Sequence, residues 1–391
     1  MERIGIFGGS FDPPHIGHMQ AAQQAIDLLH LDRLLLIPAG VAPHKAASTE
    51  KGEHRLQMLR LAAGQMPRAE VSDLEILRGN ISYTCETVQQ IRAMYPHAEL
   101  FLLMGSDMFL SFDHWKNPEF ILEHATLAVF CRGTKGEKPA IAEKKAQMQA
   151  CGHRVCVLEN DVVDISSTQL RRLLAFQCAD DFLPCGVGEY IRDHGLYQIA
   201  ADWKNLPEDK LEQVVISLLK PNRVAHVLGC RDTAVELAKR WGVNARDAAR
   251  AALLHDVTKA LDGPLQLTLC NGYGKVLDDF SIRYPKTLHA LTGSLVAERI
   301  FGENEAVVAA IESHTTGKAA MNMLEKIIYV ADYMEPNRDF PGVEQLRHLA
   351  FTDMDGALKL GLEMTLEHLK RQGAEVSPAS REALEYLRVK V

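Results

Sequence analysis

The stretch GGSFDPPHIGH, residues 8–18, combines residue types that are suited to holding a phosphate group. Its glycine pair permits a tight turn and a close approach of the backbone to a ligand. His15 and His18 follow a proline-stiffened turn at a spacing of three, so they share one face of the helix that we expect there. A helix start offers unpaired N–H groups to phosphate, and both imidazoles can donate to its oxygens. The alternative is a turn with two surface histidines.

Three later positions offer groups that complement a bound phosphate. Asp107 follows an apolar run and Gly105, where its carboxylate could accept a hydrogen bond from a ribose hydroxyl. Trp115 could stack on an aromatic base, and a buried core tryptophan is the alternative. Lys45 supplies a compact positive charge for a phosphate, unless it is a solvated loop lysine. Taken together, these groups suit a nucleotide.

Residues 164–172, DISSTQLRR, place hydroxyl side chains where a strand is expected to pass into a helix. Ser166, Ser167 and Thr168 can cap that helix and contribute hydrogen-bond donors. Arg171 lies one turn after Thr168 and can point the same way. The segment could therefore cradle phosphate groups. A helix cap with surface arginines is the alternative.

The second half of the chain contains a set of residues with metal-ligating character. His255 and Asp256 are adjacent near the end of an apolar helix, where they are costly to bury unless they are paired or bound to a metal. His226 lies one helix earlier, and Asp332 is an isolated acid in a later apolar helix. Imidazole and carboxylate together suit iron or manganese better than an ion that prefers thiolates. Satisfied helix histidines and a buried ion pair are the alternatives.

The elements that must position these groups differ between the two halves. Short apolar runs alternate with helical stretches such as residues 19–29 and 87–94 over the first 200 residues. We expect strands at residues 4–7, 34–37, 100–104, 127–131 and 155–158. This alternation predicts an α/β doubly wound parallel sheet over residues 1–200. Ligands of such sheets bind beyond the carboxyl ends of the strands, which is where the candidate residues lie.

Strand-like runs nearly vanish after residue 206, so residues 206–391 are predicted to form an all-α helical bundle. The linker is expected near residues 198–207, where WKNLP interrupts any regular pattern. We expect helices at residues 211–219, 224–241, 245–259, 291–301, 305–313 and 323–333.

Bulk properties narrow the class of protein. A length of 391 residues favours two domains. The net charge of −8 argues against a nucleic-acid partner, because phosphate backbones are met by basic surfaces. We find neither a signal-peptide pattern nor an apolar run of roughly 18–20 residues, so no membrane association is expected. The eight cysteines include no C-x-x-C pair. We therefore expect a cytoplasmic protein with small-molecule nucleotides as partners, and a homo-oligomer stays open.

The first motif resembles the nucleotidyltransferase superfamily with its H-x-G-H signature and, with residues 37–45 and 79–84, bacterial nicotinate-nucleotide adenylyltransferases. The resemblance implies transfer of AMP from ATP to nicotinate mononucleotide, giving nicotinate adenine dinucleotide and pyrophosphate, with Mg²⁺ arriving on ATP. Alanine at position 42 departs from the usual pair of prolines before His-Lys. Another acceptor, such as phosphopantetheine, is the alternative. The implied residues are, for catalysis, His15, His18 and Arg171; for ATP, Gly8, Gly9, Ser10, Phe11, Gly105, Asp107, Ser166, Ser167 and Thr168; and for the mononucleotide, Lys45, Tyr83, Thr84 and Trp115.

The order His226, His255-Asp256, Asp332 is similar to the HD superfamily of metal phosphohydrolases, and further to bacterial HD proteins of the YqeK type, which cleave diadenosine tetraphosphate symmetrically to two ADP. This resemblance implies a transition metal, iron first, with manganese and cobalt as alternatives. The residues that it implies for polyphosphate are Lys259, His289, His314, Thr315 and Arg338. Guanosine tetraphosphate or a nucleoside monophosphate as substrate, or a nucleotide-sensing module that regulates the transferase, are the alternatives.

Overall fold

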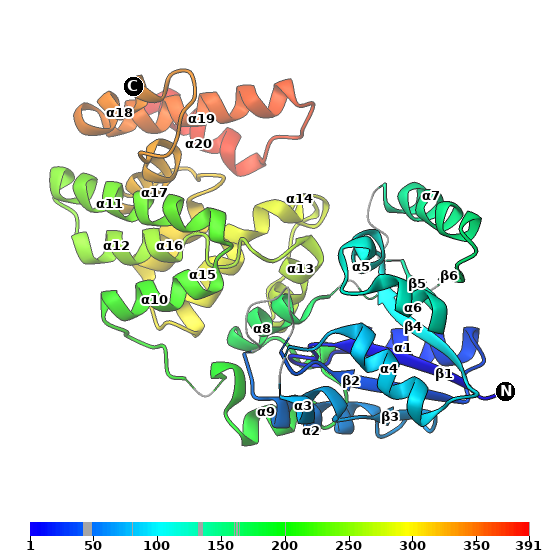
Figure 1. Cartoon of the computed structure of the whole chain (residues 1–391). Helices are drawn as coiled ribbons and strands as arrows, with labels where there is room; N and C mark the ends of the chain where they lie inside the picture. The colour runs from blue at the N-terminus through cyan, green and yellow to red at the C-terminus, as the bar shows by residue number, and fades with distance from the viewer. Residues whose placement is uncertain are drawn as a thin grey trace. The chain divides into compact units, whose positions relative to one another are not determined.

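The computed structural model describes residues 1–41, 49–79, 81–131, 136–159, 161, 163, 165–199 and 201–390. The chain forms two compact units, Met1–Ala200 and Ala201–Val391, which are described separately (Figure 1). Within these described ranges, no helix has both the length and the apolar composition needed to cross a membrane.

The first unit is built on six parallel strands in the order β3-β2-β1-β4-β5-β6. The strands are β1 (Arg3–Gly9), β2 (Arg33–Pro38), β3 (Ala69–Val71), β4 (Glu99–Gly105), β5 (Ala125–Phe130) and β6 (Val155–Leu158). The predicted doubly wound parallel sheet is confirmed. Strand β3 was not predicted, because its three residues, Ala-Glu-Val, carry too little apolar pattern to stand out.

Helices cover both faces of this sheet. They are α1 (Ile16–Leu28), α2 (Gly52–Ala63), α3 (Leu74–Arg78), α4 (Thr84–Met94), α5 (Ser106–Leu110), α6 (Pro118–His124), α7 (Glu137–Ala150), α8 (Ser167–Ala175) and α9 (Val187–Asp193), with short 3-10 helices η1 (Phe112–His114), η2 (Asp180–Phe182) and η3 (Leu196–Gln198). Leu35 and Ile37 of β2 pack into the core under α4 and α6. Their neighbours Leu34 and Leu36 point to the other face, toward α1 and α2. The alternation follows from the two-residue period of a strand.

The strand order reverses between β1 and β4, which lie side by side at the centre of the sheet. The chain leaves β1 toward one edge through β2 and β3, and leaves β4 toward the other edge through β5 and β6. The loops after these two central strands therefore diverge and leave a crevice at their carboxyl ends. Gly9 and Gly105, the last residues of β1 and β4, mark that place.

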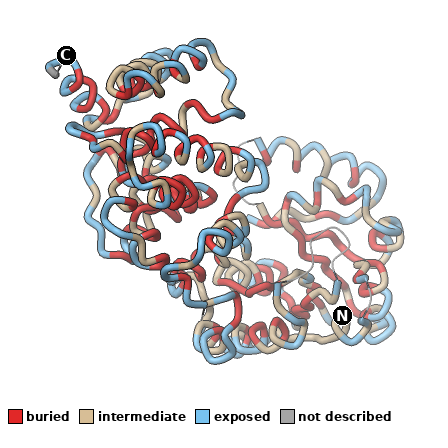
Figure 2. The backbone as a smooth tube through the Cα atoms, turned by 90° about the vertical axis from the view of Figure 1, so that its left-hand side faces the viewer, coloured by how far each residue is buried: buried red, intermediate tan, exposed pale blue. Residues whose placement is uncertain are grey.

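The second unit is entirely helical in its described part. Its elements are α10 (Glu208–Leu218), η4 (Pro221–Arg223), α11 (Val224–Trp241), α12 (Ala245–Leu254), α13 (Gly263–Gly272), α14 (Asp279–Arg283), η5 (Pro285–Leu288), α15 (His289–Arg299), α16 (Glu305–Ser313), α17 (Met323–Met334), α18 (Val343–Thr352), α19 (Met354–Arg371) and α20 (Pro378–Lys390). Helix α17 packs against α11, α12, α16 and α19 and is buried along almost its whole length. Figure 2 shows the buried residues running along the strands of the first unit and through the central helices of the second.

One predicted helix boundary is wrong. The helix expected over residues 245–259 ends at Leu254, and residues 255–260 form turns. The amide of Gln266 donates to the carbonyls of Thr258 and Leu261, and the Thr258 hydroxyl donates to the His289 carbonyl. Residues outside the segment satisfy these polar groups, so the turn can be buried. Its apolar residues therefore resemble the continuation of the helix in the sequence.

A buried ion pair helps to hold the start of the second unit against its helices. Arg250 of α12 donates through Nε and Nη2 to the carboxylate of Glu303 at 2.6–3.0 Å, and their side chains are 6% and 3% exposed. Arg250 also donates through Nη1 to the Leu206 carbonyl at 2.7 Å. Just before Leu206, the buried Trp203 stacks on Phe301, with ring centroids 5.6 Å apart. These contacts hold residues 203–206 against the helices.

We expect Glu303→Gln to lower the free energy of unfolding by about 3–5 kcal/mol, because it leaves the buried guanidinium of Arg250 without its counter-charge. The matched control is Glu375→Gln, which removes the partner of Arg283 in an exposed pair and should cost less than about 1 kcal/mol. Urea unfolding of the full chain, followed by helical circular dichroism, measures both changes. Equal effects of the two substitutions would contradict a structural role for the buried pair.

Candidate active sites

Two stacked imidazoles stand at the start of α1. The rings of His15 and His18 lie 3.5 Å apart between centroids, with 28° between their planes, and the backbone N–H of His15 donates to Nδ1 of His18 at 3.2 Å. The Phe11 ring packs against His18 at 4.9 Å. The pair therefore has a fixed position at the carboxyl end of β1, beside the crevice at the centre of the sheet.

The Ser-Ser-Thr turn lies against the same loop. The hydroxyl of Ser167 donates to the Pro13 carbonyl at 3.0 Å, although the two residues are 154 positions apart. Nη1 of Arg171 donates to the Asp12 carbonyl at 2.6 Å, and its Nη2 donates to the Thr168 hydroxyl at 3.2 Å. The start of α8 therefore contacts the loop that precedes α1, and Arg171 contacts both this loop and Thr168 of α8.

Ser166 is the N-cap of α8, and its hydroxyl accepts the N–H of Gln169 at 3.2 Å. This cap fixes where the helix begins, so the N–H groups of its first turn face the loop that holds the imidazoles. At Gly17 a Cβ atom would lie 3.1 Å from both the Val163 carbonyl and Nδ1 of His15. A glycine at this position of the H-x-G-H motif therefore allows the two segments to approach each other.

The two glycines at the end of β1 have different surroundings. A Cβ atom at Gly9 would come within 3.1 Å of the Phe11 ring, so a side chain there has no room. Among the described residues, no atom would lie within 4 Å of a Cβ atom at Gly8. The described part of the structure thus leaves room for a ligand to approach the main chain at Gly8.

The other predicted nucleotide-binding residues lie on neighbouring elements of the same unit. Asp107 is in the first turn of α5, directly after Gly105 at the end of β4. Tyr83 precedes α4 and Thr84 begins it. Trp115 is half-buried and tilted against Phe112, with ring centroids 5.2 Å apart, so its ring also serves the core.

Lys116 was not predicted to take part in this region. Its ammonium lies 3.9 Å from the centre of the Tyr83 ring and 2.9 Å from a carboxylate oxygen of Glu86. It therefore brings a positive charge beside the tyrosine that was expected near the nicotinate. Lys45 lies outside the described residues.

Arg55 is a buried cation beneath the predicted site. It is only 2% exposed and donates to the carbonyls of Ser10, Gly40 and Glu50 at 2.8–3.3 Å, which ties together the loops after β1 and β2. Burial lowers the pKa of Arg55, and the nearby Asp12 opposes that shift. Sequence reasoning missed Arg55 because one arginine in an amphipathic helix resembles a surface charge. Its spacing of four from the buried Leu59 was the available signal.

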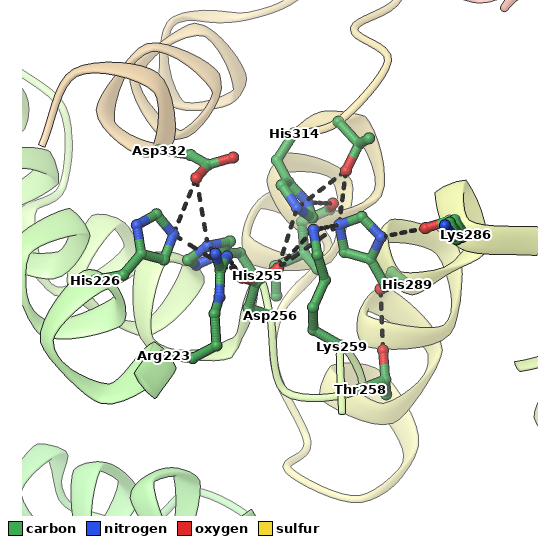
Figure 3. A network of polar contacts seen from close by, with 12 residues as sticks. Arg223, His226, His255, Asp256, Thr258, Lys259, Lys286, His289, His314 and Asp332 are labelled. Carbon is green, nitrogen blue, oxygen red and sulfur yellow. Dashed lines mark hydrogen bonds and ion pairs between the residues drawn. The ribbon is translucent and has the colours of Figure 1, made fainter. Parts of the chain in front are cut away.

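The predicted metal ligands of the second unit converge, as Figure 3 shows. Nε2 of His226 lies 3.0 Å from Oδ1 of Asp332, and Nε2 of His255 lies 3.6 Å from Oδ2 of Asp256 and 3.9 Å from Oδ1 of Asp332. His226, His255 and Asp332 place one ligand atom each within 4.8 Å of one another. Among the described atoms, Nε2 of His255 and Oδ1 of Asp256 are buried without a hydrogen bond, as expected of groups that await a cation.

His314 also joins this set, although the sequence assigned it to polyphosphate. His255, Asp256 and His314 form a second group whose ligand atoms lie within 4.8 Å of one another. Nε2 of His289 and Nε2 of His314 lie 3.6 Å and 3.9 Å from Oδ1 of Asp256. The donor set is therefore rich in imidazole nitrogen with carboxylate oxygen, which fits a divalent transition metal.

The fold fixes the orientation of each imidazole through its other ring nitrogen. Nδ1 of His255, His289 and His314 each lies within 2.6–2.8 Å of a backbone carbonyl three residues earlier in the chain. Nδ1 of His226 lies 3.1 Å from Oε1 of the buried Glu335. When Nδ1 carries the proton for such a contact, Nε2 keeps its lone pair for a metal. Glu335 was not predicted to support a ligand, although it follows Asp332 by three residues.

Burial disfavours the protonated form of three of these imidazoles, those of His255, His289 and His314. It lowers the pKa of His255 and His289 well below the usual value, and it lowers the pKa of His314 to about 4. Neutral imidazole is the form that ligates metals. The desolvation that would disfavour a protonated histidine therefore favours metal binding at neutral pH.

Cationic side chains surround the carboxylates. Arg223 contacts Asp256, Arg338 donates to Oδ1 of Asp332 at 2.8 Å, and Nζ of Lys259 lies 2.7 Å from Nε2 of His289. Arg223 and Lys259 also line a small pocket beside the cluster. Burial lowers the pKa of Lys259 to about 8. Arg223 was not among the predicted residues, since it lies at a 3-10 turn rather than in a motif.

Thr315 completes the predicted polyphosphate set. Its hydroxyl lies 3.0 Å from Nε2 of His289 and 3.1 Å from Nε2 of His314. All five residues assigned to polyphosphate by resemblance therefore contact the metal-ligand cluster. Lys259, His289 and His314 contact Asp256, Arg338 contacts Asp332, and Thr315 contacts His289 and His314.

We expect Glu335→Gln to lower metal affinity about 10–100-fold, because it removes the charged acceptor that orients His226. The matched control is Glu344→Gln, at an 81% exposed side chain whose partner is Arg347. Competition with a chromogenic chelator, on the full chain, measures both affinities. Unchanged affinity in Glu335→Gln would show that this contact does not support a metal ligand.

Comparisons with known proteins agree with the geometry of both units. A family model described as Cytidylyltransferase-like matches residues 6–173, and one described as HD domain matches residues 223–337. A probable nicotinate-nucleotide adenylyltransferase of Neisseria meningitidis is 37% identical over 204 residues, which span 51% of this chain and 100% of that protein. A protein of the same description from Gemmatimonas aurantiaca is 37% identical over 198 residues, 50% of this chain and 92% of that one.

One solved structure is similar to about half of the chain. A crystal structure from Clostridium acetobutylicum, described as an HD superfamily hydrolase involved in NAD metabolism, is 37% identical to this chain. It covers 48% of this chain and 99% of its own length, with a TM-score of 0.47. Through its N-terminal half the chain belongs to the nicotinate-nucleotide adenylyltransferase family, and its C-terminal half carries an HD domain.

Proposed function

We propose that residues 1–200 transfer the adenylyl group of ATP to nicotinate mononucleotide, releasing pyrophosphate and forming nicotinate adenine dinucleotide. The observation that carries this proposal is the junction of the stacked His15–His18 pair with α8, through Ser167 and Arg171. Family membership supports the choice of acceptor over phosphopantetheine. The residues that we assign to the mononucleotide are Lys45, Tyr83, Thr84 and Trp115.

In the proposed reaction, a phosphate oxygen of the mononucleotide attacks the α-phosphorus of ATP. The bond from that phosphorus to the bridging oxygen of the β-phosphate breaks, and pyrophosphate leaves with the electron pair. The reaction requires alignment and neutralisation of charge more than covalent help. We assign charge stabilisation at the transferred phosphate to His15, His18 and Arg171, and Mg²⁺ is expected to enter with ATP.

We expect His18→Ala to lower kcat for dinucleotide formation about 100- to 1000-fold, with little change in KM, because a donor aimed at the transition state is lost. His97→Ala, at an exposed histidine of the same unit, should leave the rate unchanged. Pyrophosphate release from ATP and nicotinate mononucleotide, coupled to a colour reaction, measures both variants. A loss below tenfold in His18→Ala would argue against this role.

For residues 206–391 we propose a metal-dependent phosphohydrolase that cleaves diadenosine tetraphosphate symmetrically to two ADP. The observation that carries it is the convergence of the Nε2 atoms of His226 and His255 with the carboxylates of Asp256 and Asp332. We propose iron as the metal, with manganese and cobalt as the alternatives. A bound metal ion would supply a water-derived nucleophile and positive charge at the attacked phosphate.

The surrounding residues have separate proposed tasks. Lys259 and Arg338 carry positive charge next to Asp256 and Asp332, where a polyphosphate could replace part of their present pairing. Thr315 and His289 add groups that can hydrogen-bond to phosphate oxygens. A chain of four phosphates offers these donors more contacts than a nucleoside monophosphate does, which supports the dinucleoside substrate.

We expect Asp332→Asn to lower both bound metal and hydrolysis of diadenosine tetraphosphate more than about 100-fold, because a charged ligand is lost. His348→Ala, at an exposed histidine, is the control. Elemental analysis and ADP formation are the two measurements, and the adenylyl-transfer rate of the same protein reports that it is folded. A wild-type chain that binds metal but hydrolyses no nucleotide would instead support the sensing module.

A further inference from the structure

The carboxylate of Asp12 is held on several sides at the base of the transferase site. Asp12 lies in the turn between β1 and α1 and is 3% exposed. Its Oδ2 accepts the N–H of Thr49 at 2.6 Å, and its Oδ1 accepts the N–H of Glu50 at 3.3 Å. Oδ1 also accepts the hydroxyl of Tyr197 at 2.8 Å, across 185 positions of the chain. Tyr197 belongs to η3, the last element of the first unit.

The same residue orients Arg171, but through its backbone. Nη1 of Arg171 donates to the Asp12 carbonyl at 2.6 Å, whereas the nearest carboxylate oxygen of Asp12 is 3.9 Å away. A neutral carbonyl therefore aligns the guanidinium, while the carboxylate is turned toward other donors. The positive charge of Arg171 remains available to an anion in the site.

An aspartate beside an arginine would otherwise form a charge-assisted pair with it, because paired hydrogen bonds between guanidinium and carboxylate are among the strongest in proteins. Such a pair would compete directly with the phosphates of ATP for Arg171. The Tyr197 hydroxyl opposes this competition by holding Oδ1 of Asp12, which fixes the rotation of the carboxylate, while the N–H of Thr49 holds Oδ2, the oxygen that lies 3.9 Å from Arg171. Burial, reinforced by the charge of Asp12, raises the pKa of Tyr197, so the phenol keeps the proton that it donates.

The fold maintains this contact in an unfavourable backbone conformation. Tyr197 and Phe11 have φ angles of 55° and 45°, in the left-handed region that bulky residues seldom adopt. The Tyr197 N–H donates to Oε1 of Glu50 at 2.9 Å, and buried Arg55 donates to the carbonyl of Glu50. Strained conformations that the surroundings hold in place are typical of functional sites.

We propose that Tyr197 is a positioning residue for adenylyl transfer, which keeps the Asp12 carboxylate from neutralising Arg171. This role rests on the transferase function proposed above. The last turn of the first unit would then contribute to the transferase site, although no sequence motif in that turn suggests this role.

We expect Tyr197→Phe in the full chain to lower kcat/KM for ATP about tenfold, as loss of a hydrogen bond to a charged group implies. KM for ATP carries most of this change, and KM for nicotinate mononucleotide stays within about twofold, since Arg171 serves the triphosphate. Calorimetric binding of an ATP analogue with a methylene bridge between its α- and β-phosphorus atoms weakens in parallel. The control is Tyr190→Phe, whose hydroxyl lies 2.9 Å from Nδ1 of His54 and outside this network.

A second substitution separates this role from a merely structural one. Asp12→Asn retains an oxygen that can accept the Tyr197 hydroxyl, but it lacks the charge that would compete for Arg171. In an Asp12→Asn background, Tyr197→Phe should therefore have no further effect on kcat/KM for ATP. If the second substitution still costs about tenfold, the hydroxyl acts only through stability, and the positioning role is overturned. Thermal unfolding of all four proteins identifies any loss of fold.

The controls also separate this proposal from the function on which it rests. A wild-type chain that makes no dinucleotide from ATP and nicotinate mononucleotide refutes the transferase function and this role with it. Wild-type turnover combined with an unchanged Tyr197→Phe overturns the positioning role alone.

Discussion

The need to satisfy buried polar groups shapes both candidate sites. A buried charge or hydrogen-bonding group is costly unless another group pairs with it. In the first unit, Asp12 and Arg55 meet this need through backbone groups of loops that are far apart in the chain. In the second unit, the Ala252 carbonyl and the Glu335 carboxylate contact Nδ1 of His255 and of His226, on the side of each ring away from the cluster. In each arrangement, some hydrogen-bonding atoms of a functional side chain are paired within the protein, and its remaining atoms can contact a ligand.

In the first unit, the order of the strands decides where these groups meet. Because β1 and β4 are neighbours while their following loops lead in opposite directions, the crevice forms at Gly9 and Gly105. Helix α8 comes after the last strand, yet its first turn packs on the loop that follows β1, through Ser167 and Arg171. The residues that we propose to bind phosphate thus come from both ends of the domain sequence, and α1 and α8 both begin at this crevice.

In the second unit, the ligands lie on rigid helices or at their ends. Helix α17 is buried on almost all sides, which fixes the position of Asp332. The turn that follows α12 carries His255 and Asp256 into the core instead of along a helix surface. Because both segments are buried, the cluster has little freedom to rearrange, and a cation would find its ligands preorganised.

The sequence alone determined the fold class and the local chemistry of both halves. Period-two and period-3.6 apolar patterns located β1, β2, β4, β5 and β6 and the helices α1, α4, α10, α11, α12, α15, α16 and α17, because these periods arise from the geometry of each element by itself. In the second unit, α13, α14, α18, α19 and α20 were not predicted. The glycines, prolines and histidines of residues 8–18 and the pair His255-Asp256 stood out for the same reason. Their type and spacing are local properties of the chain.

Only the tertiary structure revealed the partners that complete these sites. Arg55, Arg223, Glu335 and Tyr197 were not predicted, since each resembles a surface residue or a turn residue in its own segment. Their roles come from contacts such as Tyr197 with Asp12, across 185 positions. The early end of α12 at Leu254 has the same origin, because Gln266 and His289 satisfy the turn from outside. Such pairings depend on how distant segments pack, and this packing cannot be predicted from the apolar periodicity of a single segment.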